Sequence, residues 1–185
     1  MIIANIPNFI QRVIRNSEDD FYIIVQGCRQ CGYGGNLHRH ASYHRNIICK
    51  QITAKVRIQR VICPDCRKTH AIIPSDLIPY FQHTLETIIR LLEFIKVKKL
   101  PYSKVTDVFS KINPSFMLGH ISLYIKRFEN NIYRITYFYR VFKNIFLDPI
   151  ASEADILNTL MSFKLSTFNQ EYFNKMNSHF LSKVI

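Results

Sequence analysis

Long apolar runs are absent from this chain of 185 residues. Even the stretch 88–95 is interrupted by Arg90 and Glu93, whereas a membrane-spanning helix needs about 18 or more uncharged apolar residues in succession. The first residues also lack the basic and apolar regions of a secretory signal. We therefore expect a soluble, cytoplasmic protein without a membrane partner.

Glycine is scarce, with only five residues, whereas phenylalanine and tyrosine number 14 and 10. Repeats and low-complexity tracts are also missing. This composition favours a packed, mostly helical body over a disordered or solenoid chain. The length suits a helical core joined to a small metal-held module.

Acidic residues are few as well, 13 against 25 Lys and Arg, which gives a net charge of +12. They are scattered along the chain, and no D-x-D, Walker loop, nucleophile elbow or H-E-x-x-H motif is present. A metal-dependent nuclease or transposase needs several carboxylates converging on Mg²⁺. The sequence therefore indicates a binding protein rather than an enzyme.

Two C-x-x-C pairs are the strongest chemical signal: Cys28 with Cys31, and Cys63 with Cys66. Two such turns supply the four soft ligands that tetrahedral zinc prefers, so we predict one structural Zn²⁺ in a zinc ribbon. Two disulfides or plain buried thiols are the alternatives, and the missing secretory signal disfavours disulfides. If the four-cysteine set failed, histidines could replace a ligand: His38, His40 and His44.

Two further residues lie near these pairs in the sequence. Cys49 ends the apolar run Ile47–Cys49, so burial is its leading interpretation and zinc ligation the minor one. His70 follows Cys66 by four residues and could hydrogen-bond a zinc-bound sulfur or pack against the ribbon.

Positive charge concentrates in the segment 28–70, which holds nine Lys or Arg against Asp65 alone. Part of this charge could compensate the four thiolates, and a solvated basic face without a partner is the plain alternative. Surfaces of this charge density usually face phosphate, most commonly that of nucleic acid.

The residues from Leu37 onward read as strands, and Lys55–Val61 alternates basic or polar residues with apolar ones. Lys55 and Arg57 would then share one face, and Arg60 lies where the alternation shifts. The run 21–25 before the first cysteine pair also reads as a strand, after a polar turn at 16–20. The candidate nucleic-acid contacts in this part are Arg39, Arg45, Lys55, Arg57 and Arg60.

A boundary near residue 80 separates a zinc-ribbon β domain, 1–80, from a helical domain, 81–185, an α+β organisation. The segment 103–112, capped by Ser103, and the segment 117–130 read as a helix-turn-helix-like pair after a turn near Ser115. An ordinary αα-hairpin fits equally well. The exposed candidate contacts are His120, Ser122, Lys126 and Arg127.

The remaining sequence, 132–185, predicts further helices with aromatic residues at helical spacing, which indicates core packing rather than base stacking. One apolar stripe runs from Ile135 to Phe146 and ends at Asp148 and Pro149. Ser152 is a plausible N-cap for the next helix. A last helix is expected through 172–181.

Several stretches resemble a bacterial zinc-ribbon family of unknown function: Cys28–Gly32, Arg57–Cys66, Lys68–Pro74 and Leu77–Tyr80. That family is similar to the N-terminal DNA-binding region of insertion-sequence transposases. The resemblance covers residues 15–130 in outline and implies zinc at the four cysteines and DNA association through the ribbon and following helices. It implies no established activity. A full transposase would continue into an acidic-triad catalytic domain, which this chain lacks, so we expect no transposition by this chain alone.

The leading hypothesis is a zinc-containing DNA-binding protein, an accessory factor or regulator of a mobile element with no catalytic centre of its own. Its expected partner is double-stranded DNA, together with a recombinase or transposase. The first alternative is a protein-interaction module that docks on a recombinase or another enzyme. The second is an RNA-binding zinc ribbon.

Overall fold

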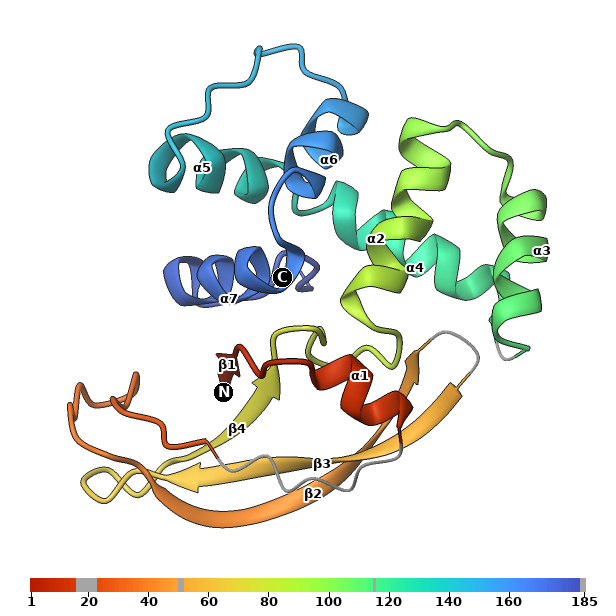
Figure 1. The fold of residues 1–185 in the computed structure, drawn as a ribbon. Helices are drawn as coiled ribbons and strands as arrows, with labels where there is room; N and C mark the ends of the chain where they lie inside the picture. The colour runs from red at the N-terminus through yellow and green to blue at the C-terminus, as the bar shows by residue number, and fades with distance from the viewer. Residues whose placement is uncertain (16–22, 50–51, 115, 184–185) are drawn as a thin grey trace.

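The computed structural model of the chain describes residues 1–15, 23–49, 52–114 and 116–183. The predicted polar turn at 16–20, the start of the predicted strand at 21–25, and the turn residue Ser115 lie outside these ranges. The described part is a four-stranded sheet followed by a helical body (Figure 1). The predicted α+β class is therefore confirmed.

The sheet has the strand order β1-β4-β3-β2, formed by β1 (Ile2–Ala4), β4 (Thr69–Pro74), β3 (Ile52–Ile62) and β2 (His38–Cys49). The strand β1 pairs in parallel with β4, and the other neighbours are antiparallel. β2 and β3 are the two long strands that the sequence predicts from Leu37 onward. The strands β1 and β4 complete the sheet.

The two faces of β3 follow the predicted alternation. Val56 and Ile58 are buried on the inner face, where they join the core formed with Phe9 and Val13 of helix α1 (Phe9–Ile14). Helix α1 and the helical body lie on this side of the sheet in Figure 1. The opposite side, which we call the outer face, carries the exposed side chains of β3.

The predicted shift in the alternation of β3 near Arg60 does not occur. The apolar pattern changes there because a different part of the chain covers the outer face of the sheet. Val61 lies on the outer face, and it is buried because the cysteine segments cover that face at this end. Cys28, Cys63 and Ile72 pack around it. The alternation thus continues through Arg60, and beyond Ile58 both faces of the sheet are covered.

The segment 23–37 forms a loop rather than the predicted strand. Its only described β-bridge joins Gln26 to Asn36, and the amide of Leu37 donates to the carbonyl of Val25 at 2.8 Å. Residues 23–25 themselves belong to no strand. The Ile23 amide donates to the Gln59 side chain at 3.2 Å rather than to the backbone of a neighbouring strand.

The helical body begins with α2 (Leu85–Leu92), which continues into a π-helical turn, η1 (Glu93–Val97). The predicted stripe on this segment is buried in one large core. The elements that follow are α3 (Tyr102–Ile112), α4 (Leu118–Glu129), α5 (Ile132–Phe142), α6 (Glu153–Met161) and α7 (Leu165–Met176). Aromatic side chains fill the centre of this core, as predicted: Tyr124, Phe128, Phe138, Tyr139, Phe168, Tyr172 and Phe180.

Three predicted helix ends differ from the structure. The last helix, expected through 172–181, ends at Met176, because Asn177 adopts a left-handed backbone with φ of 52°. Helix α3 begins at Tyr102, and Ser103 makes no capping hydrogen bond there. Helix α5 ends at Phe142, because Asn144 adopts a left-handed backbone with φ of 54°, so the apolar stripe leaves the helix before Phe146. Phe146 is consequently 76% exposed. The predicted N-cap at Ser152 is confirmed, since its hydroxyl accepts the Asp155 amide.

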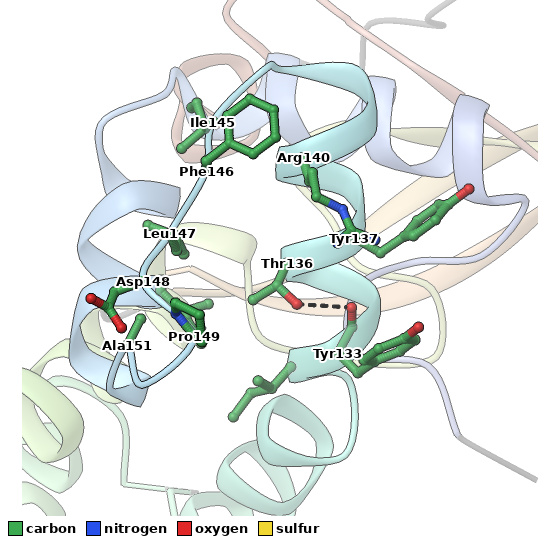
Figure 2. A pocket seen from close by; sticks show the side chains of 12 residues that line it. Tyr133, Thr136, Tyr137, Arg140, Ile145, Phe146, Leu147, Asp148, Pro149 and Ala151 are labelled. Carbon is green, nitrogen blue, oxygen red and sulfur yellow. Dashed lines mark hydrogen bonds between the residues drawn. The ribbon is translucent and has the colours of Figure 1, made fainter.

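A cleft of about 480 Å³ lies between α5 and the segment 145–151 that follows its early end (Figure 2). Tyr133, Tyr137 and Arg140 come from the helix, whereas Phe146 and Pro149 come from the opposite wall. Most of these side chains are exposed. The sequence did not predict this feature, because the segment reads as a continuous buried helix.

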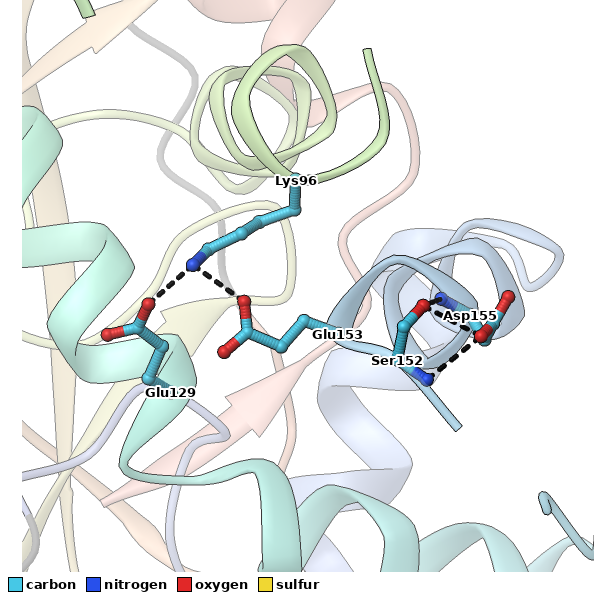
Figure 3. Close-up of polar contacts among 5 residues, drawn as sticks. All are labelled: Lys96, Glu129, Ser152, Glu153 and Asp155. Atoms are coloured by element: carbon cyan, nitrogen blue, oxygen red, sulfur yellow. Dashed lines mark hydrogen bonds and ion pairs between the residues drawn. The ribbon is translucent and has the colours of Figure 1, made fainter. Parts of the chain in front are cut away.

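An ion triad joins three elements of the helical body. The Lys96 ammonium of η1 contacts Glu129 at the end of α4 and Glu153 at the start of α6, the second at 2.6 Å (Figure 3). The Lys96 side chain is only 13% exposed. Burial lowers the pKa of Lys96, but hydrogen bonds to the two carboxylates outweigh this effect and raise it.

The sheet and the helical body are joined by direct contacts. The Arg45 guanidinium of β2 donates to the carbonyls of Ile78, at 2.6 Å, and of Phe81. The buried Asn169 side chain of α7 donates to the carbonyls of Ser75 and Leu77 at 2.9 and 3.0 Å. Across the described ranges, no helix has the length and apolarity that crossing a membrane requires.

Candidate metal centre and basic surface

The four predicted cysteines converge on one point of the structure. Their Sγ atoms all lie within 4.8 Å of one another. Cys28 and Cys66 are separated by 3.7 Å, and so are Cys31 and Cys63. With zinc–sulfur bonds of about 2.3 Å, tetrahedral geometry places sulfurs about 3.8 Å apart. The cluster could therefore hold one metal ion, and its sulfurs are not joined as disulfides.

The two C-x-x-C turns have the same backbone hydrogen bonds. The amide of the residue after the second cysteine donates to the carbonyl of the first, from Gly32 to Cys28 at 2.8 Å and from Arg67 to Cys63 at 3.1 Å. Gly32 and Arg67 share a left-handed backbone, with φ of 81° and 59°. One residue further on, the Tyr33 and Lys68 carbonyls accept the amides of Cys28 and Cys63. We call these turns the first and second knuckle.

Backbone amides point at the sulfurs of this cluster. Burial opposes ionisation of Cys28, but the amides of Cys31 and Gln30, with His70 and Cys66, lower its pKa to about 6. For Cys31 the Tyr33 amide lowers the pKa, but desolvation and the neighbouring thiols raise it to about 12. One thiolate is thus favoured whereas four together repel each other, and a bound cation removes that repulsion.

His70 lies beside the cluster as an outer partner. Its Nε2 is 3.3 Å from Cys28 Sγ, and its ring is buried. This is one of the two roles that the sequence left open for it. Cys49 is buried at the far end of β2 and does not belong to the cluster, as expected. The alternative ligands likewise lie outside it, exposed on β2: His38, His40 and His44.

The outer face of the β2–β3 pair carries the candidate basic contacts Lys55 and Arg57, both exposed. The register pairs them with Asn46 and His44 of β2, whose side chains are exposed on the same face. The Arg57 Nε donates to the Ser42 hydroxyl at 2.7 Å, which orients the guanidinium along the surface. Arg39 is also exposed and lies opposite Val61, at the end nearer the cysteines.

Arg45 and Arg60 differ from these residues, because the register puts them on the inner face with Val56 and Ile58. Arg45 binds the two carbonyls before α2, and burial lowers its pKa. Arg60 is half-buried and donates to the Thr69 hydroxyl at 2.6 Å. Both guanidinium groups therefore hold the fold together.

The predicted helix pair is present as α3 and α4, but these helix bounds fit an αα-hairpin as well as a helix-turn-helix. Ser122 and Lys126 are exposed, and Arg127 is half-buried. His120 is also half-buried, and its Nδ1 accepts the Met117 amide at 3.0 Å, so it caps its own helix. Large apolar side chains share this exposed surface: Met117, Leu118 and Leu123.

One functional candidate was missed by sequence reasoning. Arg29 lies between the cysteines of the first knuckle and binds the C-terminal end of α7, through the Phe173 carbonyl at 3.3 Å and the Asn174 side chain. About 145 residues separate these partners along the chain. No local pattern reports such a contact.

Part of the chain matches a known family. Residues 28–107 match a family described as a domain of unknown function, DUF6431. The matched region begins at Cys28 and includes all four clustered cysteines, β2–β4, α2 and part of α3. No curated protein and no solved structure matches the chain.

Proposed function

We propose that Cys28, Cys31, Cys63 and Cys66 bind one structural Zn²⁺. The sulfur separations, the paired knuckles and the amides directed at the sulfurs all support this assignment. Four thiolates complete a tetrahedral shell and leave no position for a substrate water. The ion would therefore hold the ribbon in shape and offset the repulsion between the thiolates.

The zinc proposal predicts that purified protein carries about one zinc per chain, because structural sites of this ligand set use a single tetrahedral ion. Cys28→Ser should lose the zinc and unfold the ribbon, since metal binding and folding are linked. Elemental analysis and circular dichroism on the same sample measure both effects. Cys49→Ser is the matched control and should keep its zinc. Stoichiometric zinc in Cys28→Ser would disprove the ligand assignment.

We further propose that the outer face of β2–β3 binds nucleic acid, with double-stranded DNA as the leading ligand. The observation that carries this proposal is the exposed row of Lys55 and Arg57 on a strand pair, in a segment without any acidic residue between positions 21 and 64. No carboxylate of that segment can repel a phosphate. Positive surfaces of this kind bind the DNA backbone mainly through charge.

The other side chains on this face favour a duplex over a single strand. The described exposed residues there are polar or basic, with Ser42, His44 and Asn46 beside the two cations. Single-stranded nucleic acid is usually held by aromatic rings that stack on its bases, and these positions carry no Phe, Tyr or Trp. Strands of 11 and 12 residues extend about 35–40 Å, close to one turn of B-DNA.

A binding competition tests the choice of ligand. We expect duplex DNA to displace a labelled duplex more strongly than single-stranded RNA of the same length. Arg57→Gln should weaken duplex binding, whereas Arg140→Gln, an exposed cation on α5, should not. If single-stranded RNA competes better, the protein is an RNA-binding ribbon instead. Because the sequence resembles the N-terminal DNA-binding region of transposases, we propose that the protein acts as an accessory factor or regulator of a mobile element.

The second candidate function is a protein-interaction module, and the cleft beside α5 favours it. Tyr133 and Phe146 are 78% and 76% exposed on its two sides, and large apolar side chains grouped around one cleft are typical of surfaces that meet a partner. A recombinase or another enzyme with apolar anchor residues would fit this cleft. Phe146→Ser would then abolish co-purification of that partner without affecting DNA binding.

A further inference from the structure

The first knuckle is attached to the last helix of the protein through Arg29. Its guanidinium donates to the Phe173 carbonyl at 3.3 Å and to the Asn174 side chain, and lies 5.2 Å from the centre of the Phe173 ring. The last carbonyls of a helix have no partner within the helix, and its C-terminal end favours positive charge. The Phe173 carbonyl also accepts the Asn177 amide at 3.0 Å, so Arg29 adds a positive charge and a second donor at the C-terminal end of α7.

Helix α7 connects the sheet side of the molecule with the helical core. Asn169, one turn before Phe173, binds the carbonyls that follow β4, and the helix also contacts β1. Beyond its left-handed end at Asn177, Phe180 and Leu181 are buried in the helical core. The C-terminal turn of α7 therefore lies between the cysteine cluster and the largest core of the protein.

Apart from the cysteine cluster and the contacts of Arg29, the described contacts of the first knuckle are its own short backbone hydrogen bonds, the bridge between Gln26 and Asn36, and a small core. Its segment belongs to no strand, and the small core beneath it includes Cys28 and Cys63 themselves. The four sulfurs share no covalent bond. A bound metal ion would join the two knuckles at this point and fix the turn that holds Arg29, which lies between Cys28 and Cys31.

We propose that metal binding at the four cysteines is coupled, through Arg29, to the order of the C-terminal turn of α7. This inference rests on the zinc site proposed above. Metal loss would withdraw the guanidinium from the helix end and loosen residues 173–177. By linkage, a partner that binds and orders this end of α7 would raise the affinity of the cluster for metal.

Hydrogen exchange on the full chain tests this coupling, with zinc measured on each sample. In wild type, chelation should speed the exchange of amides 173–177 about tenfold or more, the expected effect of losing a charged hydrogen bond. The zinc-loaded Arg29→Met variant should keep its zinc and already show the faster exchange at amides 173–177. Removing its zinc with a chelator should speed that exchange little further. The amides of α3 serve as internal reference, and Lys68→Met, an exposed change in the second knuckle, as matched control. Asn174→Ala removes one acceptor and should show a smaller increase in the same amides.

Two results overturn the coupling while leaving the zinc site intact: zinc-loaded Arg29→Met with wild-type exchange at 173–177, or equal effects of chelation in wild type and Arg29→Met. If wild type binds no stoichiometric metal, the zinc proposal fails and the coupling fails with it. Zinc measurement thus distinguishes the two failures.

Discussion

Single residues set the shape of the two knuckles. Gly32 and Arg67 occupy the same position with the same left-handed backbone, although this conformation is strained for any residue with a side chain. A Cβ at Gly32 would meet no other described atom within 4 Å. The only cost of a side chain there is therefore backbone strain.

We predict that Gly32→Ala destabilises the protein by about 1 kcal/mol, because alanine disfavours a positive φ. Gly34→Ala is the matched control: Gly34 has no positive φ and the same open surroundings, so its effect should be near zero. Chemical unfolding of the zinc-loaded variants measures the difference. Equal unfolding free energies for both variants would contradict the backbone argument.

Two buried histidines make stability depend on pH. His83 is 1% exposed, its Nδ1 lies 2.6 Å from the Tyr124 hydroxyl, and burial together with His120 lowers its pKa to about 4. Burial, with Arg127 and Arg134, does the same for His179. The unfolded chain binds these protons near pH 6.5 and the folded chain only near pH 4, so stability falls as the pH drops between these values.

Each histidine should cost about 1–2 kcal/mol of stability between pH 7 and pH 5, after allowance for partial solvent screening. His83→Gln should reduce this loss, because glutamine does not titrate. The measurement is the difference in unfolding free energy between the two pH values for wild type and variant. Any effect of acid on the metal site is the same in wild type and in His83→Gln, so it cancels when the two pH dependences are compared. An unchanged pH dependence in His83→Gln would refute the assignment.

At the scale of helices and strands, the ion triad shows how elements distant in sequence are joined (Figure 3). Lys96 lies between two carboxylates from α4 and α6. Removing it would leave Glu129 and Glu153 facing each other without a cation. In a neighbouring ion pair, Lys98 with Glu93 at 2.9 Å, the lysine side chain is 50% exposed against 13% for Lys96.

Lys96→Met should therefore destabilise the protein by about 1–2 kcal/mol, since the ammonium is largely buried although its partners are partly solvated. Lys98→Met should cost less than about 0.5 kcal/mol, as is usual for exposed pairs. Thermal unfolding of the two variants in parallel measures the contrast. Equal losses would mean that the triad adds nothing beyond a surface ion pair.

The spacing of apolar residues predicted a helix or strand well where one face of that element packs against a single core. The buried stripe of α2 and the alternation of β3 as far as Ile58 were predicted correctly, because each depends on residues within one segment. The predicted shift at Arg60 was wrong, because remote segments bury Val61 on the outer face. The predicted end of α5 was wrong, because the left-handed backbone at Asn144 stops the helix although the apolar spacing continues beyond it. The sequence also gave no sign that Arg45 would reach the carbonyls before α2, because β2 is polar on both faces over most of its length.

At the scale of the whole molecule, the sheet separates two environments. The helical body and α1 lie on its inner side (Figure 1), and the cysteine cluster covers the outer face at one end only. Cysteine spacing was sufficient to predict the cluster, because ligand type and the C-x-x-C turn are local properties. The distribution of basic residues between the two faces was not predictable, since it depends on strand register and on contacts from remote segments.

The proposed function requires that Lys55 and Arg57 on the outer face contact the phosphates of duplex DNA. The most direct test is the dependence of the binding constant on salt concentration, measured on zinc-loaded protein. The logarithm of the binding constant should fall linearly with the logarithm of the salt concentration, and the double variant Lys55→Gln/Arg57→Gln should reduce that slope by about 2, one for each lost phosphate contact. Arg140→Gln should leave the slope unchanged. A binding constant that does not change with salt concentration, or a double variant with the wild-type slope, would show that Lys55 and Arg57 do not contact DNA phosphates.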